Sequence, residues 1–509
     1  MTVVATTAGD LRGVCEEGGC VAFLGVPFAE PPVGRRRFRP PVPVARWSGV
    51  RAAERYGPAA AQLAKRGIFD PLDPIDEDCL YLNVWTPAPD DGARPVLVWI
   101  HGGGLRGGSG AEAVFRGSHL AARGDCVMVT INYRLGALGG FVLLEELGDP
   151  RLAESANVGL LDQLMALRWV QDNVAAFGGD PRRVTVAGQS SGGQSVGVFL
   201  GLPEAAGLFA GAIAQSPAPT RLLDREVARQ LGERYAAHLS GRGVDRGDIA
   251  TAPAADLVAA VASLKKETDW GPIGHPLHPI VDGRVIARQP LDVLASGGGN
   301  PVPLLAGSNR DELVLRIGAT GAGEPEPAPT EAELAEAWRT PFPGSTDGRS
   351  HAAQLAAAYN PRATAGLDPP GPPPTPFLQG ERMTRISAIR LLEAAVGHGP
   401  PAFSYLFTWD PPSHCGAAHC LELPLVFDTA GESKIGRLYG EGGDEVAAMT
   451  DLIQSAWVAF VRTGDPATES LPAWPRYEPD RRATMLLDRS PRVLDDPWRD
   501  QRKAWEGVV

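Results

Sequence analysis

The sequence has few cysteines, no excess of basic residues and no long apolar run. Its 509 residues include six cysteines without a disulfide-framework spacing, so we expect reduced thiols. The formal net charge of −12 argues against binding to nucleic acid, which requires a basic surface. No apolar run reaches the roughly 20 residues that span a bilayer, and the N-terminus lacks a basic segment followed by an apolar one. These absences predict a cytoplasmic chain without nucleic-acid or membrane partners.

The sequence pattern predicts the alternation of strands and helices that is typical of an α/β protein. Short apolar runs predict strands over residues 80–85, 95–100, 126–132 and 183–187. Between the last two strands, apolar residues at helical spacing predict a helix over 159–176. Such alternation indicates a parallel or mixed sheet, whose ligand site lies at the carboxyl ends of the strands. Beyond about residue 220 the pattern becomes mainly helical.

The most informative motif is a G-x-S-x-G pattern between the last of these strands and an apolar helical segment. Gly188 and Gly192 flank Ser190, and small residues are needed there because the two arms of such a strand-to-helix turn nearly touch. The turn exposes the serine hydroxyl at its tip as a candidate nucleophile. The pentapeptide alone is a weak signal, since a chain with 61 glycines can contain it by chance.

A second glycine-rich segment supplies candidate donors for an oxyanion. Residues 101–104 read His-Gly-Gly-Gly and directly follow the predicted strand that ends at residue 100. Consecutive glycines let the backbone turn its N–H groups toward one point, so Gly103 and Gly104 are the candidate donors. Ser191, which follows the candidate nucleophile at the start of a helix, is the third. An ordinary glycine-rich turn would have the same composition.

A hydroxyl nucleophile also needs a base and an acid that orients the base. Among the nine histidines, His419 lies on a predicted loop just before an apolar segment that could anchor it. Glu312 follows a short apolar strand and is the candidate acid, with the adjacent Asp311 as its rival. Taken by themselves, a loop histidine and neighbouring carboxylates are more often plain surface residues.

Several stretches, in order along the chain, resemble the type-B carboxylesterase family of α/β-hydrolases, nearest in character to the bacterial para-nitrobenzyl esterases. They are residues 23–38, 77–87, the segment 177–193 around the serine turn, 309–312, the block around His419, and 457–466. The resemblance runs from roughly residue 8 to residue 490. It implies an α/β-hydrolase fold with a central, mostly parallel twisted sheet flanked by helices.

The resemblance also implies a function and its residues. The catalytic triad would be Ser190, Glu312 and His419, with Asp311 a structural neighbour. The chain would be one catalytic domain, 1–509, with helical insertions at roughly 220–300 and 318–400, although its length alone suggests about three domains. The expected activity is hydrolysis of a small to medium uncharged ester by water, without cofactor or metal, in a monomer or homodimer. A structural ion pair between Arg37 and Glu77 is implied too.

The sequence departs from the family pattern in ways that affect the expected substrate. Gln189 stands before the nucleophile where members usually carry glutamate. Residues 59–61 are alanines, so the bridge that secreted members form to the cysteine matching Cys79 is missing. Residues 48–84 contain no tryptophan to hold a quaternary ammonium, which argues against a choline ester. Leu105, where relatives often have an aromatic residue, suggests a differently shaped pocket, lined by the loop 60–78 and by helices beyond residue 220.

Two further readings stay open. His414, Cys415, His419 and Cys420 offer zinc ligands, but the adjacent His-Cys pairs lack the spacing of structural zinc sites and His419 is already needed as a base. The role of Cys415 and Cys420 is open, and Cys420 beside the base suggests thiol sensitivity. The same triad could also serve acyl transfer, lactone opening or carbamate cleavage, or the fold could be used for binding alone.

Overall fold

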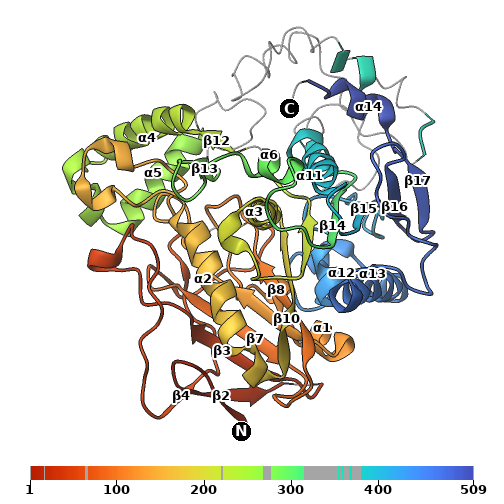
Figure 1. Cartoon of the computed structure of the whole chain (residues 1–509), viewed down its shortest axis with the longest axis horizontal. Helices are drawn as coiled ribbons and strands as arrows, with labels where there is room; N and C mark the ends of the chain where they lie inside the picture. Colours follow the sequence, from red (N-terminus) through yellow and green to blue (C-terminus); the bar gives the residue numbers. More distant parts are fainter. Residues whose placement is uncertain are drawn as a thin grey trace.

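The apolar runs form the centre of one large sheet in the computed structural model (Figure 1). The structure describes residues 2–16, 18–63, 67–218, 222–266, 277–313, 354–355, 357–359, 366–368 and 380–507. Within these residues the sheet has thirteen strands. They are β1 (Thr2–Ala5), β2 (Asp10–Cys15), β3 (Val21–Pro27), β4 (Val50–Ala52), β7 (Tyr81–Thr86), β8 (Arg94–Ile100), β9 (Val127–Ile131), β10 (Gly179–Gln189), β11 (Gly211–Gln215), β14 (Leu304–Asn309), β15 (Ala402–Phe407), β16 (Ala483–Leu487) and β17 (Arg492–Asp495).

The centre of the sheet is parallel and its two ends are antiparallel. The order is β1-β2-β3-β7-β9-β8-β10-β11-β14-β15-β16-β17, with β4 beside β2. The pairs from β9–β8 through β15–β16 are parallel. The pairs from β1–β2 through β7–β9, and β16–β17, are antiparallel. Because parallel strands share one direction, the carboxyl ends of β8, β10 and β14 meet at the same edge.

Both faces of the sheet are covered, which explains why its strands read as continuous apolar runs. Along β8, Val96, Val98 and Ile100 pack into one apolar cluster, while Leu97 and Trp99 pack into another on the opposite face. The helices α2 (Val158–Asn173) and α3 (Ser191–Leu200) contribute to the first cluster, and α13 (Gly443–Thr463) contributes to the second. This alternation follows from the two-residue period of a strand.

Among the described residues, the other helices of eight or more residues are α4 (Arg225–Ser240), α5 (Ala254–Lys266) and α11 (Ser387–Ala395). The shorter ones are α1 (Ser118–Gly124), α6 (Pro290–Ala295), α12 (Leu423–Phe427) and α14 (Arg499–Ala504). Two small sheets pair β5 (Ala59–Ala60) with β6 (Ile75–Asp76), and β12 (Leu223–Asp224) with β13 (Ile280–Val281). In Figure 1, α4 and α5 lie together at the upper left, within the predicted insertion at 220–300. Most of the second predicted insertion, 318–400, lies outside the described residues.

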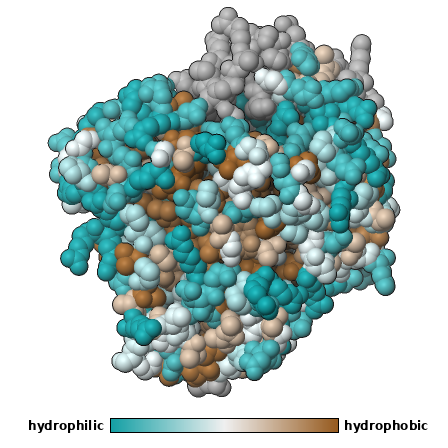
Figure 2. Space-filling model, viewed as in Figure 1, coloured by the Kyte–Doolittle hydropathy of each residue, from teal (hydrophilic) through white to brown (hydrophobic). Residues whose placement is uncertain are grey.

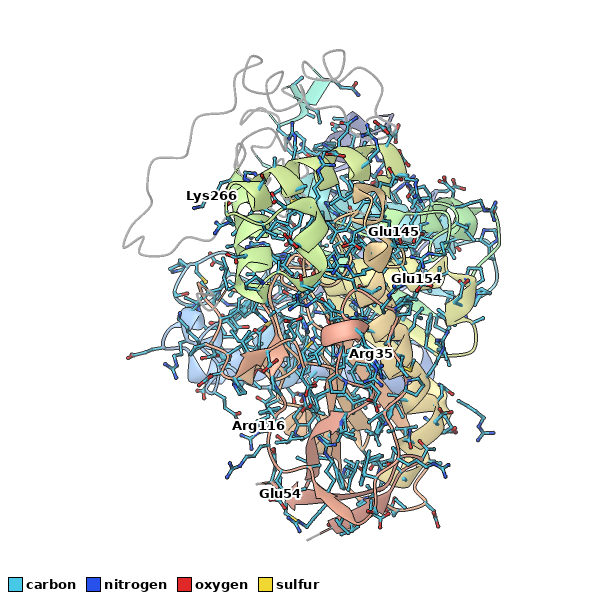
Figure 3. The ribbon with its side chains drawn as sticks, turned by 90° about the vertical axis from the view of Figure 1, so that its left-hand side faces the viewer. Arg35, Glu54, Arg116, Glu145, Glu154 and Lys266 are labelled. Atoms are coloured by element: carbon cyan, nitrogen blue, oxygen red, sulfur yellow. The ribbon has the colours of Figure 1, made fainter. Side chains whose placement is uncertain are left out.

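Charged side chains such as Glu54, Glu154 and Lys266 lie at the surface of the molecule (Figure 3). Polar residues cover most of the face in Figure 2, with apolar residues gathered near its centre. Among the described helices, none combines the length and the apolar character needed to cross a membrane. All six cysteines are free thiols, and Cys79 is buried.

The expected pair between Arg37 and Glu77 is present. Nε of Arg37 donates to Glu77 Oε2 at 2.6 Å, and a second guanidinium nitrogen contacts Oε1. The two side chains are 13% and 17% exposed, so the pair is largely but not fully buried. Arg37 also donates to the carbonyl of Ala252 at 2.6 Å. The pair therefore ties the N-terminal loop to the segment that precedes α5.

Candidate active site

Ser190 lies at a strained turn between β10 and α3. Its φ and ψ are 58° and −123°, which is unusual for a residue with a side chain. The turn is held by its backbone, because Ser190 N donates to Gln215 O at 2.9 Å and Ser190 O accepts from Gln194 N at 2.9 Å. The flanking glycines have no room for a side chain: a Cβ on Gly192 would lie 2.1 Å from Ile100 O. Close packing of β8 against the turn therefore requires the small residues expected there.

The glycine-rich loop after β8 passes directly over this turn. A Cβ on Gly102 would lie 3.1 Å from Cβ of Ser190, and Leu105 N donates to Ser191 Oγ at 3.3 Å. Gly103 and Gly104 have φ values of 113° and 63°, which favour glycine. Within the described residues, no acceptor is recorded for the backbone N–H groups of Gly103, Gly104 and Ser191. Three amides without a protein acceptor thus lie beside the candidate nucleophile.

A tyrosine that sequence reasoning missed supports this loop. Tyr133 stacks on the ring of His101, with centroids 4.4 Å apart, and its hydroxyl donates to His101 O at 2.8 Å. Its only sequence signal is its position just after the predicted strand 126–132. The first residue of the loop is therefore fixed by a neighbouring strand end, while the glycines that follow are free to orient their amides.

His419 and Glu312 are in direct contact. Nδ1 of His419 lies 2.5 Å from Glu312 Oε2, and His419 N donates to the main-chain oxygen of Glu312 at 2.8 Å. The other carboxylate oxygen of Glu312 accepts from Asn309 N at 2.8 Å. The rival acid, Asp311, instead pairs with Arg310 at 2.5 Å and accepts from Ala417 N at 2.9 Å. Of the two neighbouring carboxylates, the structure sets Glu312 against the imidazole.

The Gln189 side chain also contacts the imidazole. Its Nε2 lies 3.1 Å from His419 Nε2 and 3.4 Å from Nδ1, and its Oε1 accepts from Cys420 Sγ at 3.4 Å. The contact of Nδ1 with the Glu312 carboxylate favours a ring proton on Nδ1, which is the tautomer that a base on Nε2 requires. Ser190 and His419 line the same cavity, but no hydrogen bond between their side chains is recorded in the described part of the chain.

A second buried carboxylate lies behind the first. Glu422 accepts from Gln215 Nε2 at 3.1 Å and from Asn309 Nδ2 at 2.6 Å. Burial raises the pKa of Glu422, and the nearby charge of Glu312 raises it further. Sequence reasoning missed all three residues, although Glu422 lies only three residues after His419. Asn309 bonds both carboxylates and so couples their positions.

The surroundings of the His419 imidazole favour its protonated form. Burial acts to lower the pKa of His419, but the coulombic and hydrogen-bonding effects of Cys420 and Glu312 outweigh it, and the pKa is held well above 6.5. Burial also raises the pKa of the Cys420 thiol. The thiol is therefore neutral near pH 7, so the carboxylate of Glu312 is the charge that sustains the imidazolium.

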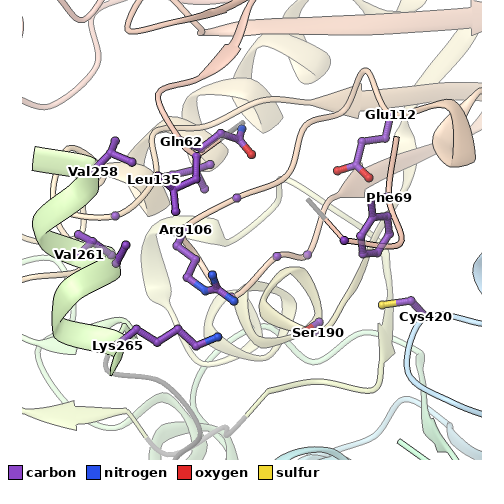
Figure 4. A pocket seen from close by; sticks show the side chains of 18 of the residues that line it. Gln62, Phe69, Arg106, Glu112, Leu135, Ser190, Val258, Val261, Lys265 and Cys420 are labelled. Atoms are coloured by element: carbon purple, nitrogen blue, oxygen red, sulfur yellow. The ribbon is translucent and has the colours of Figure 1, made fainter. Parts of the chain in front are cut away.

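Ser190, His419 and the two candidate donor glycines line a cavity of about 650 Å³, whereas Glu312 and Ser191 do not (Figure 4). Its wall includes the glycine loop, part of the loop 60–78 and the apolar side of α5, as the sequence predicted for a substrate pocket. Leu105 is fully buried in the core and does not line the cavity, and the pocket shape expected from it stays a prediction. The next residue, Arg106, does line it.

The possible metal ligands near His419 are not arranged around one point. His414 is exposed, with Nδ1 3.6 Å from Asp410, whereas Cys415 is buried. Within the ranges that the structure describes, no group of three or more His, Cys, Asp or Glu side chains could hold a metal ion.

The strained turn at Ser190, the glycine loop and a carboxylate-bound histidine lie together at one edge of a parallel sheet. The family model for the carboxylesterase family matches residues 1–505. The chain belongs to the carboxylesterase family. This carboxylesterase therefore has the α/β-hydrolase fold predicted from its sequence.

Curated relatives match over almost the whole length. The carboxylesterase is 36% identical over 498 residues to a phenmedipham hydrolase of Pseudarthrobacter oxydans, covering 95% of this chain and 94% of that protein. It is 35% identical over 513 residues to the para-nitrobenzyl esterase of Bacillus subtilis (strain 168), covering 98% of both. Among solved structures, a thermophilic para-nitrobenzyl esterase superposes with a TM-score of 0.85 at 33% identity, covering 99% of each chain. The resemblance to para-nitrobenzyl esterases is thereby confirmed.

Proposed function

We propose that this carboxylesterase hydrolyses small to medium esters through an acyl-enzyme on Ser190. The observation that carries the proposal is the contact between His419 and Glu312 at the cavity that Ser190 also lines. Glu312 holds the imidazole with its Nδ1 protonated, which leaves Nε2 as the base. The membership of the family supports ester hydrolysis as the reaction class.

In the first step Nε2 of His419 accepts the proton of the Ser190 hydroxyl, and the serine oxygen attacks the ester carbonyl. To do so the imidazole exchanges the amide of Gln189 for the hydroxyl of Ser190, which lines the same cavity. The amides of Gly103, Gly104 and Ser191 would hold the tetrahedral oxyanion. His419 then gives its proton to the leaving alcohol.

In the second step water takes the place of the alcohol. His419 removes a proton from water, the resulting oxygen attacks the acyl carbonyl, and the serine oxygen leaves as it regains the proton. No cofactor or metal takes part in this scheme. Product analysis in added methanol tests the acceptor: we expect the free acid to dominate, and a dominant methyl ester would make the enzyme an acyl transferase instead.

Replacing Ser190 tests the nucleophile. We expect Ser190→Ala to lower kcat on 4-nitrophenyl acetate by about 10⁴–10⁶, because removing a triad nucleophile leaves only binding and oxyanion contacts. Ser195→Ala is the matched control, since Ser195 lies one turn further along α3 and does not line the cavity. Labelling by a fluorophosphonate should be lost only in the Ser190 variant. A Ser190→Ala enzyme with most of its turnover would refute the assignment.

The cytoplasmic location and the monomeric or homodimeric state expected from the sequence stay predictions. So does the expectation that neither nucleic acid nor membrane is a partner.

A further inference from the structure

Two cationic side chains project into the cavity from different elements. Arg106 belongs to the glycine loop, where its backbone N–H donates to Gly103 O at 3.3 Å. Lys265 comes from the last turn of α5. Figure 4 shows the guanidinium and the ammonium directed toward the same space, on one side of Ser190. Residues far apart in sequence therefore bring two positive charges to one part of the wall.

No carboxylate among the described residues pairs with either cation. Both side chains are exposed to solvent. The surrounding wall still removes part of the water around the Arg106 guanidinium, and this desolvation lowers the pKa of Arg106. Burial lowers the pKa of Lys265 as well, and the positive charge of Arg106 lowers it further. Two neighbouring positive charges that have no counter-ion among the described residues repel each other, which is a poor structural arrangement. They are a good arrangement for a ligand that supplies the missing negative charge.

The remaining residues of the cavity wall indicate where the negative charge of a ligand would lie. Glu112, the carboxylate among the described lining residues, lies on the opposite side of the cavity near Phe69 (Figure 4). Its Oε1 accepts from Ser109 N at 3.1 Å. On the cationic side, Leu257, Val258 and Val261 of α5 and Leu135 supply apolar surface. The cavity is thus apolar with a positive end, and the negative end is remote from it.

We propose that Arg106 and Lys265 bind an ionised carboxylate at the far end of the ester substrate. The substrate class is then a monoester of a dicarboxylic acid, or an ester of similar shape, in which an apolar spacer separates the ester from the carboxylate. This proposal rests on the proposed ester hydrolysis and replaces the uncharged ester expected from the sequence. Arg106 and Lys265 act in specificity, and the bonds made and broken are those already given.

The test compares charged and capped substrates of equal length. Mono-4-nitrophenyl esters of adipic, suberic and sebacic acid are assayed beside the same esters with the free carboxylate methylated. We expect kcat/KM to favour the charged ester by about tenfold to hundredfold at the best spacer length, as charge-assisted hydrogen bonds allow. The preference should shrink as sodium chloride is raised, since salt screens partly exposed charges. Equal kcat/KM values for charged and capped esters at every length overturn the proposal.

Variants assign the preference to the two cations. Arg106→Gln and Lys265→Gln should each lower the ratio of charged to capped kcat/KM by about tenfold, and the ratio cancels any general loss of activity. Lys266→Gln is the matched control, because it removes the same charge from the next residue of α5, outside the cavity lining (Figure 3). A ratio that falls equally in the Lys266 variant would point to net charge and contradict the proposal.

A binding measurement separates this proposal from the proposed reaction. Adipate dianion is titrated calorimetrically into the wild-type enzyme, Lys265→Gln and Lys266→Gln. Adipate binding that is weakened in Lys265→Gln but not in Lys266→Gln supports the cation pair. If neither ester is hydrolysed, that failure contradicts the proposed hydrolysis but not the cation pair. The opposite outcome is that the capped esters are hydrolysed as fast as the charged ones and that adipate binding is absent or equal in all three proteins. This outcome contradicts the cation pair and supports the proposed hydrolysis.

Discussion

At the scale of single residues, the centre of the site is an imidazole between two different neighbours. The Glu312 carboxylate lies 2.5 Å from Nδ1, whereas the neutral amide nitrogen of Gln189 lies 3.1 Å from Nε2 and 3.4 Å from Nδ1. A glutamine in this place can donate a hydrogen bond to the base and accept one from Cys420 without adding a second negative charge. A charged residue at position 189 would therefore change the proton affinity of the imidazole.

The first prediction at this scale concerns pH. A protonated imidazole cannot act as base, so kcat/KM should fall as the pH falls through the pKa of His419, which lies well above 6.5. We expect the acid limb of the kcat/KM profile above that value. Glu312→Gln should move the limb to lower pH and reduce kcat by about 10⁴, as loss of the orienting acid does in other triads. An unmoved limb in this variant would contradict the role of Glu312.

The raised pKa of His419 also affects how the stability of the fold depends on pH, in the opposite direction to activity. A folded-state pKa above the unfolded value means that the His419–Glu312 pair stabilises the fold fully below about pH 6.5, the ordinary value for histidine. This contribution is lost as the pH rises through the raised pKa. Activity and this part of the stability should therefore change in opposite directions over the same pH window.

The second residue-scale prediction concerns Gln189→Glu. A carboxylate this close to the imidazole should raise the pKa of His419 further, by about 1–3 units, because an opposite charge within a few ångströms favours the protonated form. The acid limb of kcat/KM should move to higher pH while the activity at high pH is retained. Gln62→Glu, elsewhere on the cavity wall, is the control. A limb that moves equally in both variants would indicate a general field effect instead.

At the scale of elements, the site depends on a strand-to-loop turn packed against a strand-to-helix turn. The loop after β8 and the turn between β10 and α3 approach so closely that side chains are excluded at Gly102, Gly188 and Gly192. β8 and β10 are hydrogen-bonded parallel neighbours, so their carboxyl ends emerge side by side. The pairing of the two strands thus brings the proposed oxyanion donors to the nucleophile.

The element-scale prediction is that Gly103→Val lowers kcat by about 10²–10³, the cost of losing an oxyanion donor. A Cβ at this position would lie 2.0 Å from Gly107 O, so the loop has to move and its N–H groups no longer point toward the oxyanion. Gly207→Val is the control, since Gly207 also has a positive φ, of 77°, but no atom within 4 Å of its Cβ. Normal kinetics in a folded Gly103→Val enzyme would remove this loop from the site.

At the scale of the whole molecule, a buried ion pair connects the sheet to its helical layer. Arg134, in the loop after β9, donates to Asp162 of α2 from Nε at 2.8 Å and from Nη2 at 2.7 Å. The two side chains are 4% and 0% exposed. Tyr133, the neighbour of Arg134, supports the glycine loop through His101. The pair therefore contributes to global stability and to the placement of the site together.

The whole-molecule prediction is that Asp162→Ala destabilises the fold by about 3–5 kcal/mol, because it leaves the Arg134 guanidinium buried without its counter-ion. The free energy of unfolding in urea measures the effect. Glu226→Ala removes an exposed partner of Arg229 and should change the midpoint little. Equal midpoints for the two variants would show that the buried pair contributes no more than a surface one.

Much of this architecture could be predicted from sequence, because it follows from local rules. β-branched runs and helical spacing located β7, β8, β9, β10 and α2 to within a few residues. The glycines around Ser190 and after residue 101 marked the two turns, since only glycine fits such close approaches. Motif resemblance named the family and added the Arg37–Glu77 pair, which no local rule could supply.

The tertiary structure alone decided which distant groups meet. Asp311 and Glu312 are equivalent by composition and position, and only the path of the chain around His419 sets one against the imidazole and the other against Arg310. The same holds for Arg106 and Lys265, which share no motif and lie on different elements. Periodicity and turn chemistry act over a few residues and determine elements. The meeting of side chains depends on how those elements pack, which the order and register of the sheet determine.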